Sequence, residues 1–222
     1  MIIEVCIESK LGIKVAQKFN LDRIEVCRDL NQDGLTPTEK LQEDAKNIFI
    51  KDRFIMIRPH NNGFVYEKND IVKMKKSISL ARKYQPKGVV FGGLTKDHKI
   101  DLKSNEDLIH HAKSLNLVCT FHRAFDNCVE PIQSFKEIIA LGFDWLLSSG
   151  QENTAEIGIP LLKKLNKLKN DKIKILAGGG INSSNCKKFK IIEMDGIHFS
   201  IDKNKVIEQQ KIENILNQLS IN

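Results

Sequence analysis

Two cysteines occupy matching places in two similar segments, Ile-Glu-Val-Cys at 3–6 and again at 24–27. Both segments are typical of short β-strands, whose side chains point alternately to opposite faces. The apolar residues suit an outer face, so Cys6 and Cys27 are predicted to point inward together. Thiolate sulfur is a preferred ligand of Cu(I), which makes this pair a candidate metal site. The alternative is inert packing, because unpaired cysteine behaves as a small apolar side chain.

Ionisable side chains share this inward face. The same alternation sends Glu4, Glu25, Arg58, His122 and His198 inward from different strands. Glu25 and His122 are candidate general acid and base, and Arg58 is a candidate anion-binding residue. The competing interpretation is a buried network in which the two glutamates, Arg58 and the imidazoles only satisfy one another.

A run of three glycines follows the seventh apolar segment and predicts an anion site. Gly178, Gly179 and Gly180 let the backbone approach a ligand closely and offer N–H donors to a phosphate, with Ser149 and His198 as further candidates. A tight turn that requires positive φ would also explain the glycines. A capping role would equally explain the serine.

The stretch Thr-Phe-His-Arg-Ala-Phe-Asp at 120–126 ends another apolar segment with three titratable groups. Arg123 is an alternative to Arg58 for binding a carboxylate or phosphate. Ordinary hydrogen bonding within a loop is the competing explanation. Schiff-base chemistry is disfavoured because no lysine falls at an inward strand end, and a hydrolytic metal centre is disfavoured because no His-x-His pair is present.

The elements that must position these residues recur along the whole chain. Eight short apolar runs alternate with amphipathic helical stretches, a pattern typical of repeated βα units. The predicted strands are 2–7, 23–27, 53–58, 88–92, 118–123, 145–149, 173–178 and 196–200. The predicted helices are 11–19, 38–48, 69–84, 104–115, 131–141, 154–168, 183–190 and 205–219.

Eight units of similar weight predict one closed (β/α)₈ TIM barrel over residues 1–222, with a C-terminal helix. The chain is slightly short for this fold. An open doubly wound sheet is disfavoured because residues 8–12 lack the glycine fingerprint of a dinucleotide site. Active sites of such barrels lie at the carboxyl ends of the strands, where the polar residues fall.

Composition narrows the class of protein further. The net charge is +7, but Lys and Arg are dispersed among acidic residues and no recognition motif accompanies them, so nucleic-acid binding is not expected. No long apolar run predicts a membrane span or a secretory signal. Five cysteines at scattered spacings fit free thiols in a reducing compartment, so we expect a cytoplasmic protein.

Several of these segments together resemble the CutC family, over about residues 2–200. The segments that carry the resemblance are IEVCIES at 3–9, DRIEVC at 22–27, GLTPT at 34–38, FIMIRP at 54–59, GVVFGGLT at 88–95, TFHRAFD at 120–126, LSSGQ at 147–151 and AGGGI at 177–181. The chain departs from the family pattern at 60–63, where a cation and an acid are missing, and at 198–201, which is bulkier.

The resemblance implies a cytosolic protein of copper homeostasis with a (β/α)₈ barrel and Cu(I) bound through Cys6 and Cys27. No organic cofactor is implied. An alternative is a barrel enzyme that acts on a small phosphorylated or carboxylated metabolite through Glu25, His122 and Arg58. A third hypothesis is a scaffold that self-associates into a homo-oligomer.

Overall fold

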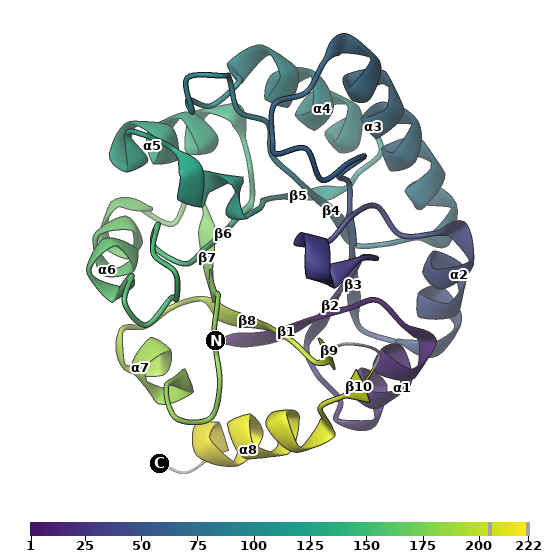
Figure 1. The fold of residues 1–222 in the computed structure, drawn as a ribbon, viewed down its shortest axis with the longest axis vertical. Coiled ribbons are helices and arrows are strands. Elements are labelled where there is room, and N and C mark those ends of the chain that lie inside the picture. The colour runs from purple at the N-terminus through teal and green to yellow at the C-terminus, as the bar shows by residue number, and fades with distance from the viewer. Residues whose placement is uncertain (204–205, 221–222) are drawn as a thin grey trace.

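The computed structural model describes residues 1–203 and 206–220 and contains a closed barrel of eight parallel strands (Figure 1). Strand β8 closes the ring against β1, with His198 opposite Glu4. The strands are β1 (Ile2–Ile7), β2 (Arg23–Val26), β3 (Asp52–Met56), β4 (Gly88–Phe91), β5 (Val118–Phe121), β6 (Trp145–Ser148), β7 (Lys174–Gly178) and β8 (Gly196–Ser200). The predicted (β/α)₈ barrel is therefore confirmed.

Helices surround the barrel on all sides in Figure 1, and α8 adds the predicted C-terminal helix. They are α1 (Lys10–Lys18), α2 (Glu39–Ile48), α3 (Lys68–Ala81), α4 (Leu102–Ser114), α5 (Pro131–Leu141), α6 (Ile159–Leu168), α7 (Cys186–Ile191) and α8 (Gln209–Ser220). Short 3₁₀ helices lie at η1 (Leu30–Gln32), η2 (Arg82–Tyr84) and η3 (Arg123–Asn127). Within the described ranges, no helix is long and apolar enough to cross a bilayer.

The last three predicted helices begin later than expected. Helix α6 starts at Ile159 instead of 154, because Gly158 precedes it and a proline occupies its first turn. Helix α7 starts at Cys186, with Asn185 at the N-cap position. Before α8, the chain forms a small antiparallel hairpin of β9 (Asp202–Lys203) and β10 (Val206–Ile207), and the predicted helix start at 205 lies outside the described residues.

Side-chain alternation along the strands separates an apolar outer layer from a polar interior. Val5, Ile7, Ile24 and Val26 are fully buried in the large core between barrel and helices. Their neighbours point inward, as the alternation predicts. A barrel interior is normally filled by branched apolar side chains, so the polar groups found here mark the place where this barrel departs from plain packing.

The amino-end half of the barrel interior is filled. Trp145, Leu147 and Leu176 form one apolar cluster there. The guanidinium of Arg23 lies between two aromatic rings, with Cζ 4.0 Å from the ring centre of Phe54 and 4.5 Å from that of Trp145. Aromatic faces attract such a cation and also shield it from water. This packing places any open space toward the carboxyl ends of the strands.

Candidate functional site

The carboxyl ends of the strands enclose a cavity of about 1230 Å³. Six of the predicted site residues line it: Cys6, Glu25, His122, Gly179, Gly180 and His198. The other four, Cys27, Arg58, Ser149 and Gly178, lie outside its lining. The cavity is therefore at the face where barrels of this fold carry their sites.

A buried chain of charges lies on the barrel wall beneath the cavity. Arg23 pairs with Glu4 through its Nε, and the other carboxylate oxygen of Glu4 lies 2.6 Å from Nδ1 of His198. Burial alone would raise the pKa of Glu4, but Arg23 and the hydrogen bond with His198 lower this pKa to about 2. Glu4 is therefore an anion that fixes the orientation of the His198 ring.

Glu4 leaves the second nitrogen of His198 free to face the cavity. The Cys6 sulfur, a Glu25 carboxylate oxygen and a ring nitrogen of His198 all lie within 4.8 Å of one another. Burial alone would lower the pKa of His198, but Cys6, Glu4 and Glu25 beside the ring raise this pKa well above its usual value. The three side chains form a compact set of one sulfur, one oxygen and one nitrogen donor.

Glu25 is the carboxyl group in this site that can change its charge near neutral pH. Its Oε2 lies 4.0 Å from Nε2 of His198. Burial raises the pKa of Glu25 to about 7, even though the charge of His198 opposes the shift. Among the described residues, its Oε1 has no hydrogen-bond partner, although it is buried. A buried polar atom without a partner is costly, so this oxygen is available to a ligand.

Cys27 lies beside Cys6 but behind the cavity wall. Glu25, not Cys27, is the residue opposite Cys6 in the strand register. Cys27 is fully buried in a small apolar cluster with Cys6, Phe54 and Met56. Its Sγ donates to the Ile7 carbonyl at 3.4 Å, and burial, together with Cys6, raises the pKa of its thiol well above the usual range.

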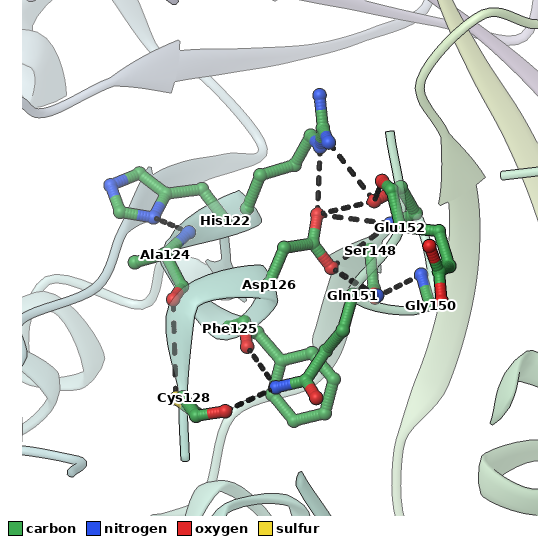
Figure 2. A network of polar contacts seen from close by, with 11 residues as sticks. His122, Ala124, Phe125, Asp126, Cys128, Ser148, Gly150, Gln151 and Glu152 are labelled. Atoms are coloured by element: carbon green, nitrogen blue, oxygen red, sulfur yellow. Dashed lines mark hydrogen bonds and ion pairs between the residues drawn. The ribbon is translucent and has the colours of Figure 1, made fainter. Parts of the chain in front are cut away.

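His122 faces the cavity from the strand β5 side as a neutral imidazole. Its Nδ1 accepts the N–H of Ala124 at 3.2 Å (Figure 2). Burial and the charge of Arg58 lower the pKa of His122 to about 3. Its Nε2 has no partner within the described part of the chain. Because His122 lines the cavity, this nitrogen can donate a hydrogen bond to a bound molecule.

Arg58 holds a loop over the barrel mouth and does not line the cavity. Its Nη1 donates to the carbonyls of Gln32 at 2.7 Å and Gly34 at 3.2 Å. Its Cζ lies 4.8 Å from the ring centre of Phe64. The backbone N–H of Leu30 donates to Glu8 at 2.9 Å and fixes the same loop from the other side. The buried network that we considered as an alternative forms without Arg58, because Arg23 and His198 pair with Glu4.

Asp126 is the centre of a polar network that includes Ser148 at the end of β6 and Gln151 (Figure 2). Arg123 and Ser149 belong to the same network. The carboxylate of Asp126 accepts from the Ser148 hydroxyl at 2.6 Å and from Nε of Arg123 at 2.8 Å. Ser149 is fully buried, and its hydroxyl lies within hydrogen-bond distance of two acceptors, the Asp126 carboxylate at 3.0 Å and the Glu152 carbonyl at 2.6 Å, to one of which it donates its single proton. Ser149 therefore organises this corner of the barrel, whereas Arg123 lines the cavity itself.

The sequence of this chain is similar to those of known proteins of one family. The family model described as the CutC family matches residues 1–202. The family protein CutC of Glaesserella parasuis serovar 5 (strain SH0165) is 37% identical over 203 residues, which cover 90% of this chain and 82% of that protein. The chain belongs to the CutC family. The corresponding protein of Pasteurella multocida (strain Pm70) is 39% identical over 186 residues, or 84% of this chain and 75% of that one.

Solved structures place this CutC family member among (β/α)₈ barrels. CutC from Streptococcus agalactiae, which is described as a copper homeostasis protein, superposes with a TM-score of 0.83 at 28% identity and covers 90% of this chain and 98% of its own. Thiamine phosphate pyrophosphorylase from Pyrococcus furiosus superposes with a TM-score of 0.66 at 14% identity, covering 98% and 94% of the two chains. This second likeness concerns the fold alone.

Arg23 is the site residue of this CutC family member that sequence reasoning missed. Strand alternation already indicated it, since Arg23 is two residues before Glu25 and therefore shares its face. Arg23 was overlooked because it lies at the start of its strand, whereas the site was expected at the carboxyl ends of the strands. The structure assigns it to the charge chain that orients His198.

The raised pKa of Glu25 predicts a pH-dependent stability for this CutC family member. The folded-state pKa of Glu25, about 7, lies above the ordinary 4.5, so what protonated Glu25 contributes to the free energy of unfolding is full below pH 4.5 and is lost as pH rises through 7. Glu25→Gln mimics the protonated form and does not lose this contribution. We therefore expect the free energy of unfolding of Glu25→Gln, relative to that of wild type, to increase between about pH 4.5 and about pH 8.5, by at most about 1.4 kcal/mol per pH unit.

Urea unfolding of both proteins at the two pH values measures this difference. Glu130→Gln is a matched control, because the same change is made on an exposed residue before α5. A difference between Glu25→Gln and wild type that stays constant with pH would contradict the buried, shifted carboxyl group.

Proposed function

We propose that this protein binds Cu(I) as part of copper homeostasis, with Cys6 and His198 as the metal ligands. The observation that carries the proposal is the convergence of the Cys6 sulfur, a His198 nitrogen and a Glu25 oxygen within 4.8 Å on the cavity wall. Soft thiolate sulfur favours Cu(I), and imidazole also suits copper. Copper is the cargo here, so the site needs a ligand set that can both take and release it.

The contacts around His198 support metal binding. A ligating imidazole commonly donates its other ring N–H to a carboxylate, which fixes the ring and strengthens the ligand. Glu4 occupies that position at 2.6 Å from Nδ1, and Arg23 holds Glu4 in turn. Ligands must lose their protons to bind a metal, and Glu25 stands beside both ligands as an acceptor.

The unpaired polar atom of Glu25 and the open cavity fit a site that receives a ligand. The copper homeostasis description of the S. agalactiae relative agrees with this cargo. All five cysteines are free thiols, which is the state expected in the reducing cytoplasm, so we place the protein there. Cys27 supplies packing behind Cys6 in this proposal and is not a ligand.

Anaerobic titration with Cu(I) against a chromogenic chelator tests the proposal. We expect one tightly bound equivalent per chain, and X-ray absorption of that complex should show one sulfur and one nitrogen neighbour. Zn²⁺ in excess serves as a competitor. Failure to remove Cu(I) from the chelator would overturn the copper function, and two sulfur neighbours would overturn the Cys6 and His198 ligand pair.

A further inference from the structure

Arg123 presents part of its guanidinium to the cavity on the side opposite β1. Its Nε is held by Asp126 at 2.8 Å, and its Nη2 donates to the Ser149 hydroxyl at 2.9 Å. These two bonds fix the plane of the group, so Nη1 has a defined direction. A Cβ built on Gly179 would lie 3.6 Å from Nη1, which shows that this nitrogen sits directly beside the glycine backbone.

The glycine segment next to Arg123 leaves backbone donors without protein partners. Gly179 and Gly180 have φ of +113° and +73°, a conformation that side-chain-bearing residues rarely adopt. Within the described residues, the N–H groups of Gly180 and Ile181 donate to no protein acceptor. Gly179, Gly180 and Ile181 all line the cavity. Successive free amides beside an arginine form a setting that suits a multivalent anion.

The charge distribution around the cavity mouth separates this corner from the rest. Two cations and five acidic residues line the mouth in the segments that follow β1, β2 and β8, and the cations Arg28 and Lys211 pair with Asp29 and Glu208. The other three acidic residues are Glu8, Asp33 and Asp202. Near the glycines, the carboxylate of Asp126 also lines the cavity, but its oxygens already accept from Arg123, Ser148, Ser149 and Gln151. The side of the mouth away from the glycines therefore has more carboxylates than cations, whereas the glycine corner offers Arg123 and backbone N–H groups to an anion.

We propose that Arg123 and the Gly179–Ile181 backbone bind the phosphate of a small phosphate monoester, whose remaining polar groups reach His122 and Glu25. A phosphate presents three terminal oxygens, enough for the fork of Arg123 and the free amides together. His122 Nε2 and Glu25 Oε1, which have no partner among the described residues and belong to residues that line the cavity, form hydrogen bonds with hydroxyl or carbonyl groups of the ligand. Ser149 does not take part, since Asp126 engages its hydroxyl. His198 does not take part either, since Glu4 holds Nδ1 and the other ring nitrogen lies with Cys6 and Glu25.

Calorimetric titration of the full chain with ribose 5-phosphate tests this site, with ribose and gluconate as matched ligands. We expect saturable binding of ribose 5-phosphate, weaker binding of inorganic phosphate and none of ribose. Arg123→Gln should weaken binding of ribose 5-phosphate by roughly 10- to 100-fold, as expected for loss of charge-assisted hydrogen bonds. Arg123→Lys keeps the charge without the fork and should give an intermediate loss.

Arg82→Gln is the control, because it removes the same charge from an exposed position outside the cavity lining. Asp126 retains its other donors in Arg123→Gln, so the unfolding midpoint of that variant should stay close to wild type. Equal affinity of Arg123→Gln and wild type, absence of any binding of phosphate compounds, or equal binding of gluconate would each overturn the proposal. Arg123→Gln should leave Cu(I) affinity unchanged, because Arg123 is not among the proposed copper ligands, which separates this site from the copper proposal.

Discussion

Replacing Cys6 by serine is expected to abolish tight Cu(I) binding. The substitution removes the soft sulfur donor and leaves only oxygen donors and the His198 nitrogen in the cluster, a ligand set that favours metals other than Cu(I). Loss of an outer-shell partner already costs roughly 10- to 100-fold in metal affinity, so loss of the thiolate ligand should cost at least about 100-fold. Competition against a Cu(I) chelator under anaerobic conditions measures the change.

Cys27→Ser provides the matched control for this prediction. Both cysteines are buried neighbours, but Cys27 lies outside the cavity lining and its Sγ donates to a backbone carbonyl. Serine can keep that hydrogen bond, so we expect the affinity to change by less than about 10-fold. Equal losses in the two variants would instead assign both sulfurs as ligands, as the sequence resemblance implies. Unchanged binding in Cys6→Ser would remove this cluster as the copper site.

The largest expected effect on stability comes from Arg23→Met. The side chain of Arg23 is only 3% exposed, and its loss would leave the Glu4 carboxylate buried beside His198 without its main partner. Breaking a buried pair in this way costs roughly 3–5 kcal/mol. For a chain of this size, each kcal/mol corresponds to roughly 2–4 °C. We therefore expect the melting temperature to fall by about 6–20 °C, as measured by calorimetry.

Two comparisons make this result interpretable. Lys40→Met removes a cation whose side chain is 71% exposed and which pairs with Glu43 and Asp44, and we expect no resolvable change in melting temperature. Adding Glu4→Gln to Arg23→Met removes the stranded charge, so the double variant should be more stable than Arg23→Met alone. A melting temperature of Arg23→Met equal to that of Lys40→Met would show that the buried pair contributes little.

Strand alternation was sufficient to predict which side chains share the barrel interior. Cys6, Glu25 and His198 were each assigned to the inner face from the apolar residues that flank them, and the structure brings them together. The eight-unit pattern also predicted closure of the barrel. Both features depend on local periodicity, which a sequence displays directly.

The residues that lie opposite each other on neighbouring strands could not be predicted, because their pairing depends on the stagger between the strands. The register sets Arg23 opposite Glu4 and Glu25 opposite Cys6, so Cys27 does not lie opposite Cys6 as their matching positions in the two segments suggested. Loop contacts were equally hidden. Ser149 and Arg58 are polar groups at strand ends, but only the folded loops show that Asp126 and backbone carbonyls already engage them.

The stacking of Arg23 between Phe54 and Trp145 has a consequence for traffic through the molecule. It fills the amino end of the barrel interior, and in the described part of the chain the cavity is lined from the carboxyl-end side, beside the loop that Arg58 and Glu8 hold. Under the proposed copper function, we therefore expect a protein that delivers the ion and a protein that collects it to dock on the same rim of the barrel and to compete with each other.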